Sequence, residues 1–485
     1  MKKHTILLAV VLLTAGALAT GCSSDDAAIE NPIQQTATGE MAFSATIAPK
    51  HTAAARTRSV NESGVTTWVS GEQIAVYYQK TEGYGTATAT VGTPNADGSA
   101  PITATLSGAK NGGEVKFVYP ATLANATGDD IDESILLTQQ RGVLTSSSSS
   151  IKSISRDFDA ATAKATLSTD GTSCGTTTTI GFTNRVCICV FTFLREGPST
   201  ITSMERLEIS IGGKLYVVTP YQYNSSKPIY LAMLPTKHAT ALFTVLVNGT
   251  VNASTGVTTY GENFVKISDD VTLDAGKFYT DVPITCRLAT EYSGTRTSTI
   301  ALADGAIAIL NNLSMNNFDN GPCIKYEGKN ENNGGAATII LRNNNSLTID
   351  RNKHHPAIDA LYDYKTLTIL GSGSLTATGG NECAGIGSGK QGKGANIIIR
   401  GGNIEATGGE KGAGIGGGYQ GYVKGITITS DVIRVKATAG EDAPYSIGKG
   451  ADPSAVAAFS PIYIGGIGYG GEGIDTNPFI YEPTH

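Results

Sequence analysis

The chain has 485 residues and a net charge of −6, from 36 basic and 42 acidic side chains. That length suits roughly two to four domains. A long, mildly acidic chain lacks the basic surface that nucleic-acid binding requires. Glycine is abundant, at 59 residues, but without the period of three that marks collagen. Frequent Thr, Val, Ile and Tyr, with no long helical periods, predict an all-β protein.

The N-terminus has the features of an export signal. Two lysines precede an apolar run from Ile6 to Leu18, which is too short to cross a bilayer. Small residues then stand directly before Cys22 in an arrangement that resembles a bacterial lipobox. The resemblance implies a signal peptide over residues 1–21 and a lipid on Cys22. An ordinary secretory signal with an incidental cysteine is the alternative.

Residues 22–40 predict a polar tether. They begin with Ser23-Ser24-Asp25-Asp26 after the cysteine, which is similar to the signal that sends lipoproteins of the Bacteroides group to the cell surface. A plain linker is the alternative. We expect a surface-exposed lipoprotein of the cell outer membrane, held by its lipid without spanning the bilayer.

Six cysteines follow Cys22, and their spacing does not match a metal site. Cys187 and Cys189 alternate within an apolar run, so both thiols point to one face of a strand. We expect free, buried thiols, no metal and no cofactor. The six are Cys174, Cys187, Cys189, Cys286, Cys323 and Cys383.

Residues 41–285 carry short alternating runs separated by Gly, Asn, Asp and Ser clusters, such as Gln73 to Tyr78. This pattern is typical of antiparallel β-sandwiches. A five-serine tract, Ser146 to Ser150, indicates a boundary. We predict one sandwich subdomain over residues 41–155 and a second over 156–285.

A set of motifs follows in order along this half of the chain. An alternating strand, Phe43 to Ile47, precedes an arginine-containing loop and the run Trp68-Val69-Ser70-Gly71-Glu72-Gln73-Ile74. Tyr119-Pro120-Ala121 and the closing run Leu273 to Thr280 come later. Together these motifs resemble the fimbrillin family of Bacteroides-type bacteria, and the likeness covers roughly 240 residues. It implies two β-sandwich subdomains and a place in surface fimbriae, with other fimbrial subunits as partners.

In such pilins an arginine-directed protease cuts after the first strand, and a neighbour's strand fills the vacated groove. Carried over to this chain, the cut would follow Arg56 or Arg58 and would release the strand Phe43 to Ile47. A cut there would expose unpaired backbone groups that template strand addition. Arginines that simply occupy an exposed polar loop are the alternative.

Residues 286–485 repeat with a period near 30. One file of isoleucines falls at 324, 358, 386, 415 and 447, with steps of 34, 28, 29 and 32. A second file runs Leu313, Leu347, Leu375, Ile404 and Val435. A third, strand-like segment recurs near Ile339, Leu367, Ile397 and Ile426.

Repeats of this length with three short strands and no helix predict a solenoid whose coils stack like residues into one core. We therefore expect a parallel β-helix of about five coils, right-handed by the common preference of parallel crossovers. The segment after Pro461 is expected to cap the open end. The Ala-Gly-Ile-Gly repeats resemble those of β-helical carbohydrate-binding domains on bacterial surface proteins.

The loops of the later coils hold the candidate ligand residues. Exposed aromatic rings with amides and carboxylates beside them suit saccharides, and extended repeat surfaces bind polymers well. The candidates are Tyr419, Tyr422, Tyr445, Asn381, Glu382 and Glu410. Ordinary solvation of these side chains is the alternative.

Enzymatic function has little support in the sequence. Hydrolysis requires paired carboxylates, and the richest cluster, around Asp350, His354, His355 and Asp359, reads as an exposed loop. We expect no catalytic residues. The predicted function is a cell-surface adhesin or fimbrial tip subunit with a glycan-binding β-helix. The alternatives are a free-standing glycan-binding lipoprotein outside pili and, third, a polysaccharide lyase or hydrolase.

Overall fold

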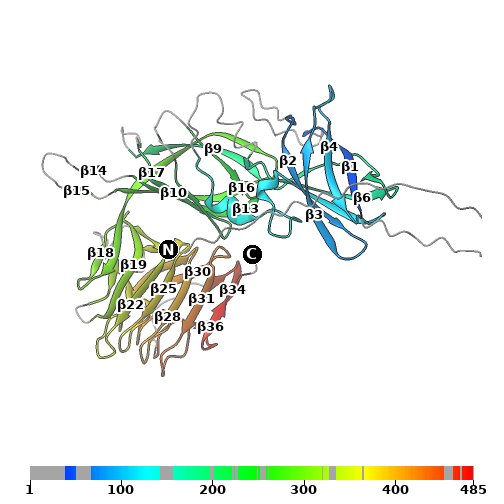
Figure 1. Ribbon diagram of the computed structural model, residues 1–485. Helices are drawn as coiled ribbons and strands as arrows, with labels where there is room; N and C mark the ends of the chain where they lie inside the picture. Colours follow the sequence, from blue (N-terminus) through cyan, green and yellow to red (C-terminus); the bar gives the residue numbers. More distant parts are fainter. Residues whose placement is uncertain are drawn as a thin grey trace, which may run out of the picture. The chain divides into compact units, whose positions relative to one another are not determined.

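The computed structural model describes residues 39–50, 67–142, 157–196, 201, 203–220, 223, 228–247, 250–251, 258–259, 261–318, 321–326, 335–362, 365–452, 462–469 and 472–483. Cys22, most of the predicted tether, Arg56, Arg58 and the five-serine tract lie outside these residues. Within the described part of the chain, no helix has the length and apolar character needed to span a membrane. Strands dominate, which confirms the predicted all-β class (Figure 1).

The first sheet closes on itself. Its strands follow the order β5-β2-β3-β4-β1-β7-β6-β8, and β5 also pairs with β6. Alternate residues such as Phe43, Ile74 and Phe117 point into one core. The sheet extends to Asn184, beyond residue 155 where the sequence predicted a boundary. The strands are β1 (Glu40–Ile47), β2 (Gln73–Gln79), β3 (Tyr84–Val91), β4 (Ala100–Ser107), β5 (Glu114–Tyr119), β6 (Ala161–Thr169), β7 (Ser173–Thr176) and β8 (Thr183–Asn184).

Two short helices, η1 (Ala121–Leu123) and α1 (Glu133–Thr138), follow β5. Asp132 caps α1 by accepting the N–H of Ser134.

A β-sandwich follows the first sheet. β11, β10, β13 and β16 form one layer, and β12, β9 and β17 form the other. Cys187, Phe193 and Phe243 lie in the core between them. A separate pair is formed by β14 (Thr250–Val251) and β15 (Thr258–Thr259). The other strands are β9 (Cys187–Arg195), β10 (Arg206–Ile211), β11 (Lys214–Val218), β12 (Ile229–Met233), β13 (Thr236–Leu246), β16 (Asn263–Leu273) and β17 (Phe278–Thr295).

One strand, β17, belongs to both the sandwich and the domain that follows. Its first part pairs with β9 up to Cys286, and Arg287 to Ala289 pair with β16. Its last residues, from Thr290, pair in parallel with the next domain. The two domains are therefore joined by continuous sheet, with no linker at the boundary predicted at residue 286.

The C-terminal domain is a parallel β-solenoid, as predicted (Figure 1). Four complete coils of three strands each run from β20 to β31, after an entering coil of β18 and β19. Their bounds are β18 (Ile300–Leu302), β19 (Ile307–Phe318), β20 (Ile324–Tyr326), β21 (Ala336–Arg342), β22 (Asn344–Ile349), β23 (Ile358–Ala360), β24 (Thr366–Gly371), β25 (Ser374–Thr378), β26 (Ile386–Gly387), β27 (Lys393–Ile399), β28 (Asn403–Thr407), β29 (Ile415–Gly416), β30 (Tyr422–Ile428) and β31 (Arg434–Thr438). The right-handed sense stays a prediction.

The isoleucine file is confirmed pair by pair. Ile324 stands opposite Ile358, Ile358 opposite Ile386, and the register continues through Ile415 to Ile447. All five side chains are fully buried in one core. Stacked branched residues of neighbouring coils exclude water from each other, which a single coil cannot do.

The second file is wrong at one position. Leu375, Ile404 and Val435 are in register, but Asn345 rather than Leu347 pairs with Leu375. Leu347 pairs with Ala377 instead. The error is a slip of two residues, and such a slip keeps the same side-chain face inward.

Antiparallel strands cap the last coil, as predicted for the segment after Pro461. β34 pairs with β33, β35 with β32, and β36 with β31. Each of the three solenoid faces therefore ends on an added strand, which covers its free parallel edge. The bounds are β32 (Ile447–Gly448), β33 (Ile462–Ile464), β34 (Ile467–Tyr469), β35 (Gly473–Ile474) and β36 (Phe479–Tyr481).

One outer face of the solenoid packs on the sandwich. Ile309, Ile340 and Leu370 form an outward file that is buried with Leu242 and Val265 of β13 and β16. Apolar residues on an outer face need such a cover, since exposed they would leave a hydrophobic strip.

Candidate functional site

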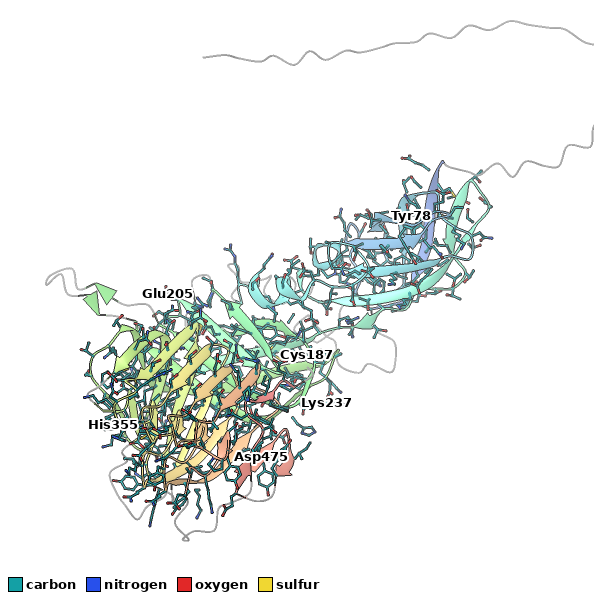
Figure 2. The ribbon with its side chains drawn as sticks, turned by 90° about the horizontal axis from the view of Figure 1, so that it is seen from below. Tyr78, Cys187, Glu205, Lys237, His355 and Asp475 are labelled. Carbon is teal, nitrogen blue, oxygen red and sulfur yellow. The ribbon has the colours of Figure 1, made fainter. Side chains whose placement is uncertain are left out.

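A cluster of charged side chains with one aromatic ring lies at a corner of the solenoid. We call it the Glu382 corner and define it by His354, Glu382, Lys390, Lys411 and Tyr419. His354, Glu382 and Lys411 each stand four residues before a ladder isoleucine, and Lys390 and Tyr419 each stand four residues after one. The stacked coils therefore bring residues 65 positions apart in the sequence (354 to 419) to one corner. His355, the neighbour of His354, is labelled in Figure 2.

The Glu382 carboxylate is surrounded by basic side chains. Lys390 Nζ donates to Glu382 Oε2 at 2.8 Å, and His354 Nδ1 lies 3.2 Å from the same oxygen. Lys411 Nζ lies 3.9 Å from Oε1. The hydrogen bond from Lys390, and then the charges of the neighbouring cations, hold the pKa of Glu382 below its usual value. The carboxylate is thus ionised, and its Oε2 already accepts a hydrogen bond from Lys390.

The Tyr419 ring is flanked by two of these cations. The ammonium groups of Lys390 and Lys411 lie 5.3 Å and 5.0 Å from its centroid, within cation–π range. The backbone N–H of Tyr419 donates to the carbonyl of Glu382 at 2.7 Å. Its hydroxyl donates to Asp452 Oδ2 at 3.2 Å. These contacts hold the ring in place across neighbouring coils.

A file of polar residues borders the corner. Gln391 Nε2 donates to Gln420 Oε1 at 2.9 Å, and Gln420 Nε2 donates to Asp452 Oδ2 at 3.1 Å. All three residues have positive φ, between 48° and 57°, because each sits in the same tight turn of its own coil. The turn repeats from coil to coil and stacks equivalent side chains.

The structure joins some of the predicted ligand residues and separates others. Glu382 and Tyr419 meet through both lysines, whereas Tyr445 packs against Gly473 of the cap. Tyr422 is half-buried at the start of β30, and Glu410 is exposed beside Lys411. Asn381 is half-buried, and its buried Oδ1 has no hydrogen-bond partner among the described residues. A ligand role for these residues stays a prediction.

Sequence reasoning missed Lys390 and His354 as parts of this corner. It also missed Gln420 and Asp452, which belong to the polar file beside the corner. The signal was present, because Lys390 and Tyr419 are 29 residues apart, as are Gln391 and Gln420. Applying the isoleucine period to the loops, and not only to the core, would have found them.

The acidic residues considered for catalysis lie in different settings. Asp350 accepts the N–H of Asn352 at 2.9 Å, which forms a local turn at the start of the exposed loop. Asp359 is a buried residue of β23. Burial lowers the pKa of His355, and the positive charges of His354, Lys353 and Lys325 lower it further. Among the described residues, no group of three or more His, Cys, Asp and Glu side chains could hold a metal ion.

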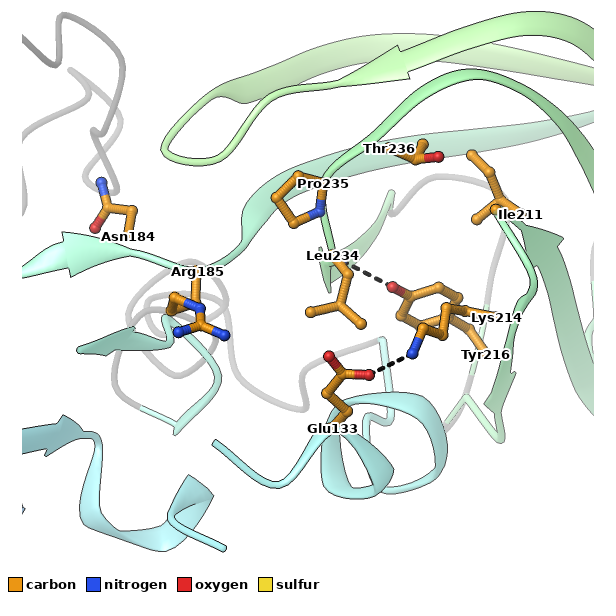
Figure 3. A pocket seen from close by; sticks show the side chains of 10 residues that line it. Glu133, Asn184, Arg185, Ile211, Lys214, Tyr216, Leu234, Pro235 and Thr236 are labelled. Atoms are coloured by element: carbon orange, nitrogen blue, oxygen red, sulfur yellow. Dashed lines mark hydrogen bonds and ion pairs between the residues drawn. The ribbon is translucent and has the colours of Figure 1, made fainter. Parts of the chain in front are cut away.

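Away from the Glu382 corner, a hollow lies beside α1, where this helix meets β11 (Figure 3). It has a volume of about 250 Å³, and Glu133, Arg185 and Tyr216 are among its lining residues. Lys214 Nζ donates to Glu133 Oε2 at 2.6 Å, and the Tyr216 hydroxyl accepts the N–H of Leu234 at 2.8 Å. The charged groups that line this hollow are in ion pairs, Lys214 with Glu133 and Arg185 with Asp130, which suits a structural joint.

No family model and no curated protein matches the chain. Solved structures of similar fold include a fimbrial protein from Bacteroides ovatus (13% identity, TM-score 0.24, 50% of each chain covered). Another is described as a candidate cell adhesion protein from Bacteroides uniformis (16% identity, TM-score 0.25, 48% of this chain and 98% of that one). A third is a fimbrial assembly protein from Parabacteroides distasonis (13% identity, TM-score 0.21, 49% and 98%).

The chain spans about half the length of the B. ovatus protein, and the match covers half of this chain. At these TM-scores the similarity is no basis for assigning a function.

Proposed function

We propose that this protein is a surface-anchored adhesin or fimbrial tip subunit whose β-helix presents a glycan-binding face. The observation that carries the proposal is the 18-residue strand β17, which pairs with the sandwich at one end and with the solenoid at the other. A solenoid that continues the sheet of its carrier is held in a defined direction. That arrangement suits a module that displays a ligand surface.

Side-chain contacts between sandwich and solenoid support the same proposal. Arg342 donates to Glu208 Oε2 at 2.7 Å and to Asn263 Oδ1 at 3.1 Å. Together with the buried apolar file that includes Ile340, these contacts resist bending at the joint. An adhesin transmits pulling force through such a joint, so a stiff connection suits the role.

A terminal place in the fibre follows from the added domain. In pilins of the fimbrillin family the donor strand lies at the C-terminus, whereas in this chain a capped solenoid follows the sandwich. Gold-labelled antibodies against the solenoid should mark fimbriae at their ends. Uniform labelling along the shaft would contradict the tip assignment.

Proteolytic activation is part of this proposal. β1 pairs with β4 from Glu40 to Ile47 and buries Phe43 and Ile47 in the first core. Cleavage at Arg56 or Arg58 would release this strand and open a groove for strand addition by another subunit. N-terminal sequencing of protein from isolated fimbriae should begin after one of these arginines, and the Arg56→Ala/Arg58→Ala double variant should stay uncleaved and unassembled.

A free-standing glycan-binding lipoprotein is the second candidate. The complete pairing and burial of β1 favour it, because the first sheet is closed when the strand is present. Surface protein that retains Phe43 to Ile47, with Cys22 lipidated and no incorporation into fimbriae, would support this candidate over the first.

A further inference from the structure

In the Glu382 corner the acidic side chain is more buried than the basic ones, which favours an anionic ligand. The side chain of Glu382 is only 12% exposed, whereas Lys390, His354 and Lys411 are 43%, 52% and 32% exposed. The carboxylate is therefore on the inside of the cluster, and the two lysines and the histidine are on the outside. An approaching molecule meets ammonium and imidazole groups before it meets the carboxylate.

Neutral sugars find few acceptors at this corner. Glu382 Oε2 already faces Lys390 and His354, and Lys411 lies 3.9 Å from Oε1. Asp452 accepts from Tyr419 and Gln420. The two lysines keep unused N–H donors, since each ammonium has three. Charge-assisted hydrogen bonds to an anionic group are stronger than neutral ones.

The aromatic ring adds a second requirement for the ligand. The ammonium groups of Lys390 and Lys411 lie 5.3 Å and 5.0 Å from the centroid of Tyr419, and Tyr419 is partly exposed. A ring fixed by its own hydrogen bonds offers a flat surface against which the apolar face of a pyranose can stack.

We infer that the Glu382 corner binds an anionic saccharide, with Lys390 and Lys411 contacting its carboxylate or sulfate and Tyr419 stacking on the sugar ring. This inference rests on the proposed glycan-binding function and narrows it to acidic glycans. The exposed carboxylate of Glu410, next to Lys411, opposes the ligand's charge and sets a limit on affinity. The chain's net charge of −6 makes unspecific attraction of polyanions weak, so binding must come from a local site.

The test uses the full chain and two matched pairs of polymers. Calorimetric titration with polygalacturonate against neutral galactan tests the carboxylate, and dextran sulfate against neutral dextran tests the sulfate. The wild-type chain should bind at least one anionic polymer better than its neutral partner, and added salt should weaken the binding. The Lys390→Gln/Lys411→Gln variant should lose roughly tenfold or more in affinity, as expected for charge-assisted hydrogen bonds.

Control variants separate the corner from its surroundings. Lys424→Gln makes the same chemical change at an exposed lysine of β30 and should leave affinity unchanged. Tyr419→Ala should weaken binding, Tyr419→Phe should retain most of it, and Glu410→Gln should strengthen it. Unchanged thermal unfolding of each variant shows that its fold is intact.

The outcomes distinguish this inference from the function on which it rests. Binding only to neutral polymers, or anionic binding that the double lysine variant retains in full, overturns the acidic-glycan site and leaves a glycan-binding adhesin in place. If the wild-type chain binds none of the four polymers and no glycan on a broad array, both the acidic-glycan site and the proposed glycan-binding function are overturned.

Discussion

Arg342 of the solenoid and Glu208 of the sandwich form an ion pair, with Nε 2.7 Å from Oε2, although the two residues are 134 positions apart in the sequence. Both side chains are only 12% exposed. The same guanidinium lies 3.3 Å from Glu291 Oε2, so one arginine neutralises two acids at the joint. Without it, Glu291 would keep the side-chain amide donors of Asn263 and Asn311. Glu208 would still pair with Arg206, whose Nη2 lies 2.6 Å from Glu208 Oε1.

Arg342→Met should destabilise the chain by about 1.5–3 kcal/mol, the range for hydrogen bonds to charged groups, because Glu291 loses its guanidinium partner while Glu208 keeps Arg206. Thermal unfolding and limited proteolysis near β17 measure the effect. Arg287→Met breaks an exposed pair with Glu196 and should cost about 1 kcal/mol or less. Equal losses in the two variants would show that burial of the joint does not matter.

Stacked glycines let neighbouring coils approach each other closely. Gly416 has a φ of +141°, and a Cβ built on it would lie 1.9 Å from the carbonyl oxygen of Gly448. Gly416→Ala should therefore push two coils apart and cost about 3 kcal/mol or more, in the range of severe overpacking. Gly466, in the β33–β34 turn, also has positive φ but nothing within 4 Å of its Cβ position. Its alanine variant should show only the backbone strain, about 1 kcal/mol.

Urea unfolding of both glycine variants checks this difference. The Gly416→Ala curve should shift to clearly lower urea than the Gly466→Ala curve, with equal slopes if the unfolded surface is unchanged. Coincident curves would mean that left-handed geometry alone, and not contact between coils, explains the glycine requirement.

The isoleucine file could be predicted from sequence because Ile386 and Ile415 stand in nearly identical segments, so their period was unambiguous. The prediction of the second file was wrong at Asn345. Both Asn345 and Leu347 are buried, but hydrophobicity alone selected Leu347 as the partner of Leu375, whereas Asn345 is that partner. The side chain of Asn345 is buried because its amide completes backbone hydrogen bonds that no aliphatic residue can make. The sharing of strand β17 by the sandwich and the solenoid could not be predicted either. The alternation of apolar and polar residues along a strand does not show which other strands it pairs with.

Asn345→Leu tests how much those hydrogen bonds contribute. Asn345 Oδ1 accepts the N–H of Leu313 at 3.0 Å, and its Nδ2 donates to the carbonyls of Arg342 and Ser374 at 2.9 Å and 3.1 Å. Leucine would match the file sterically but leave a buried N–H without its acceptor, at a cost of about 1–3 kcal/mol. A chemical-denaturation measurement should show this loss. Stabilisation by leucine would mean that apolar burial outweighs the lost polar contacts at this position.

The candidate ligand corner was only partly visible in the sequence. Glu382 and Tyr419 were selected for their chemistry, but Lys390 was not, although it lies one period before Tyr419. Charge contacts between loops depend on how the coils stack, and Lys390 and Lys411 come together around one ring only in three dimensions. The proposed ligand selection depends on the lysines being more exposed than Glu382. That difference cannot be predicted from the sequence around each residue.

The buried thiols should make the free energy of unfolding decrease as the pH rises above 9. All six described cysteines are free and buried, and burial raises the pKa of Cys286, Cys323 and Cys383 from 9.0 to about 12. The folded state keeps these protons longer than the unfolded state does. Their contribution to stability is therefore constant below pH 9 and falls as pH rises from 9 toward 12.

Each such thiol should lower the free energy of unfolding by about 1.4 kcal/mol per pH unit in that window. Because lysine and tyrosine also titrate there, the slope is compared with that of Cys383→Ala, which should be shallower by one thiol's share. The native thiols should also resist alkylation at pH 8 and react once the chain is unfolded. Rapid labelling of Cys383 in the folded protein, or identical slopes for the two proteins, would contradict a buried, neutral thiol at that position.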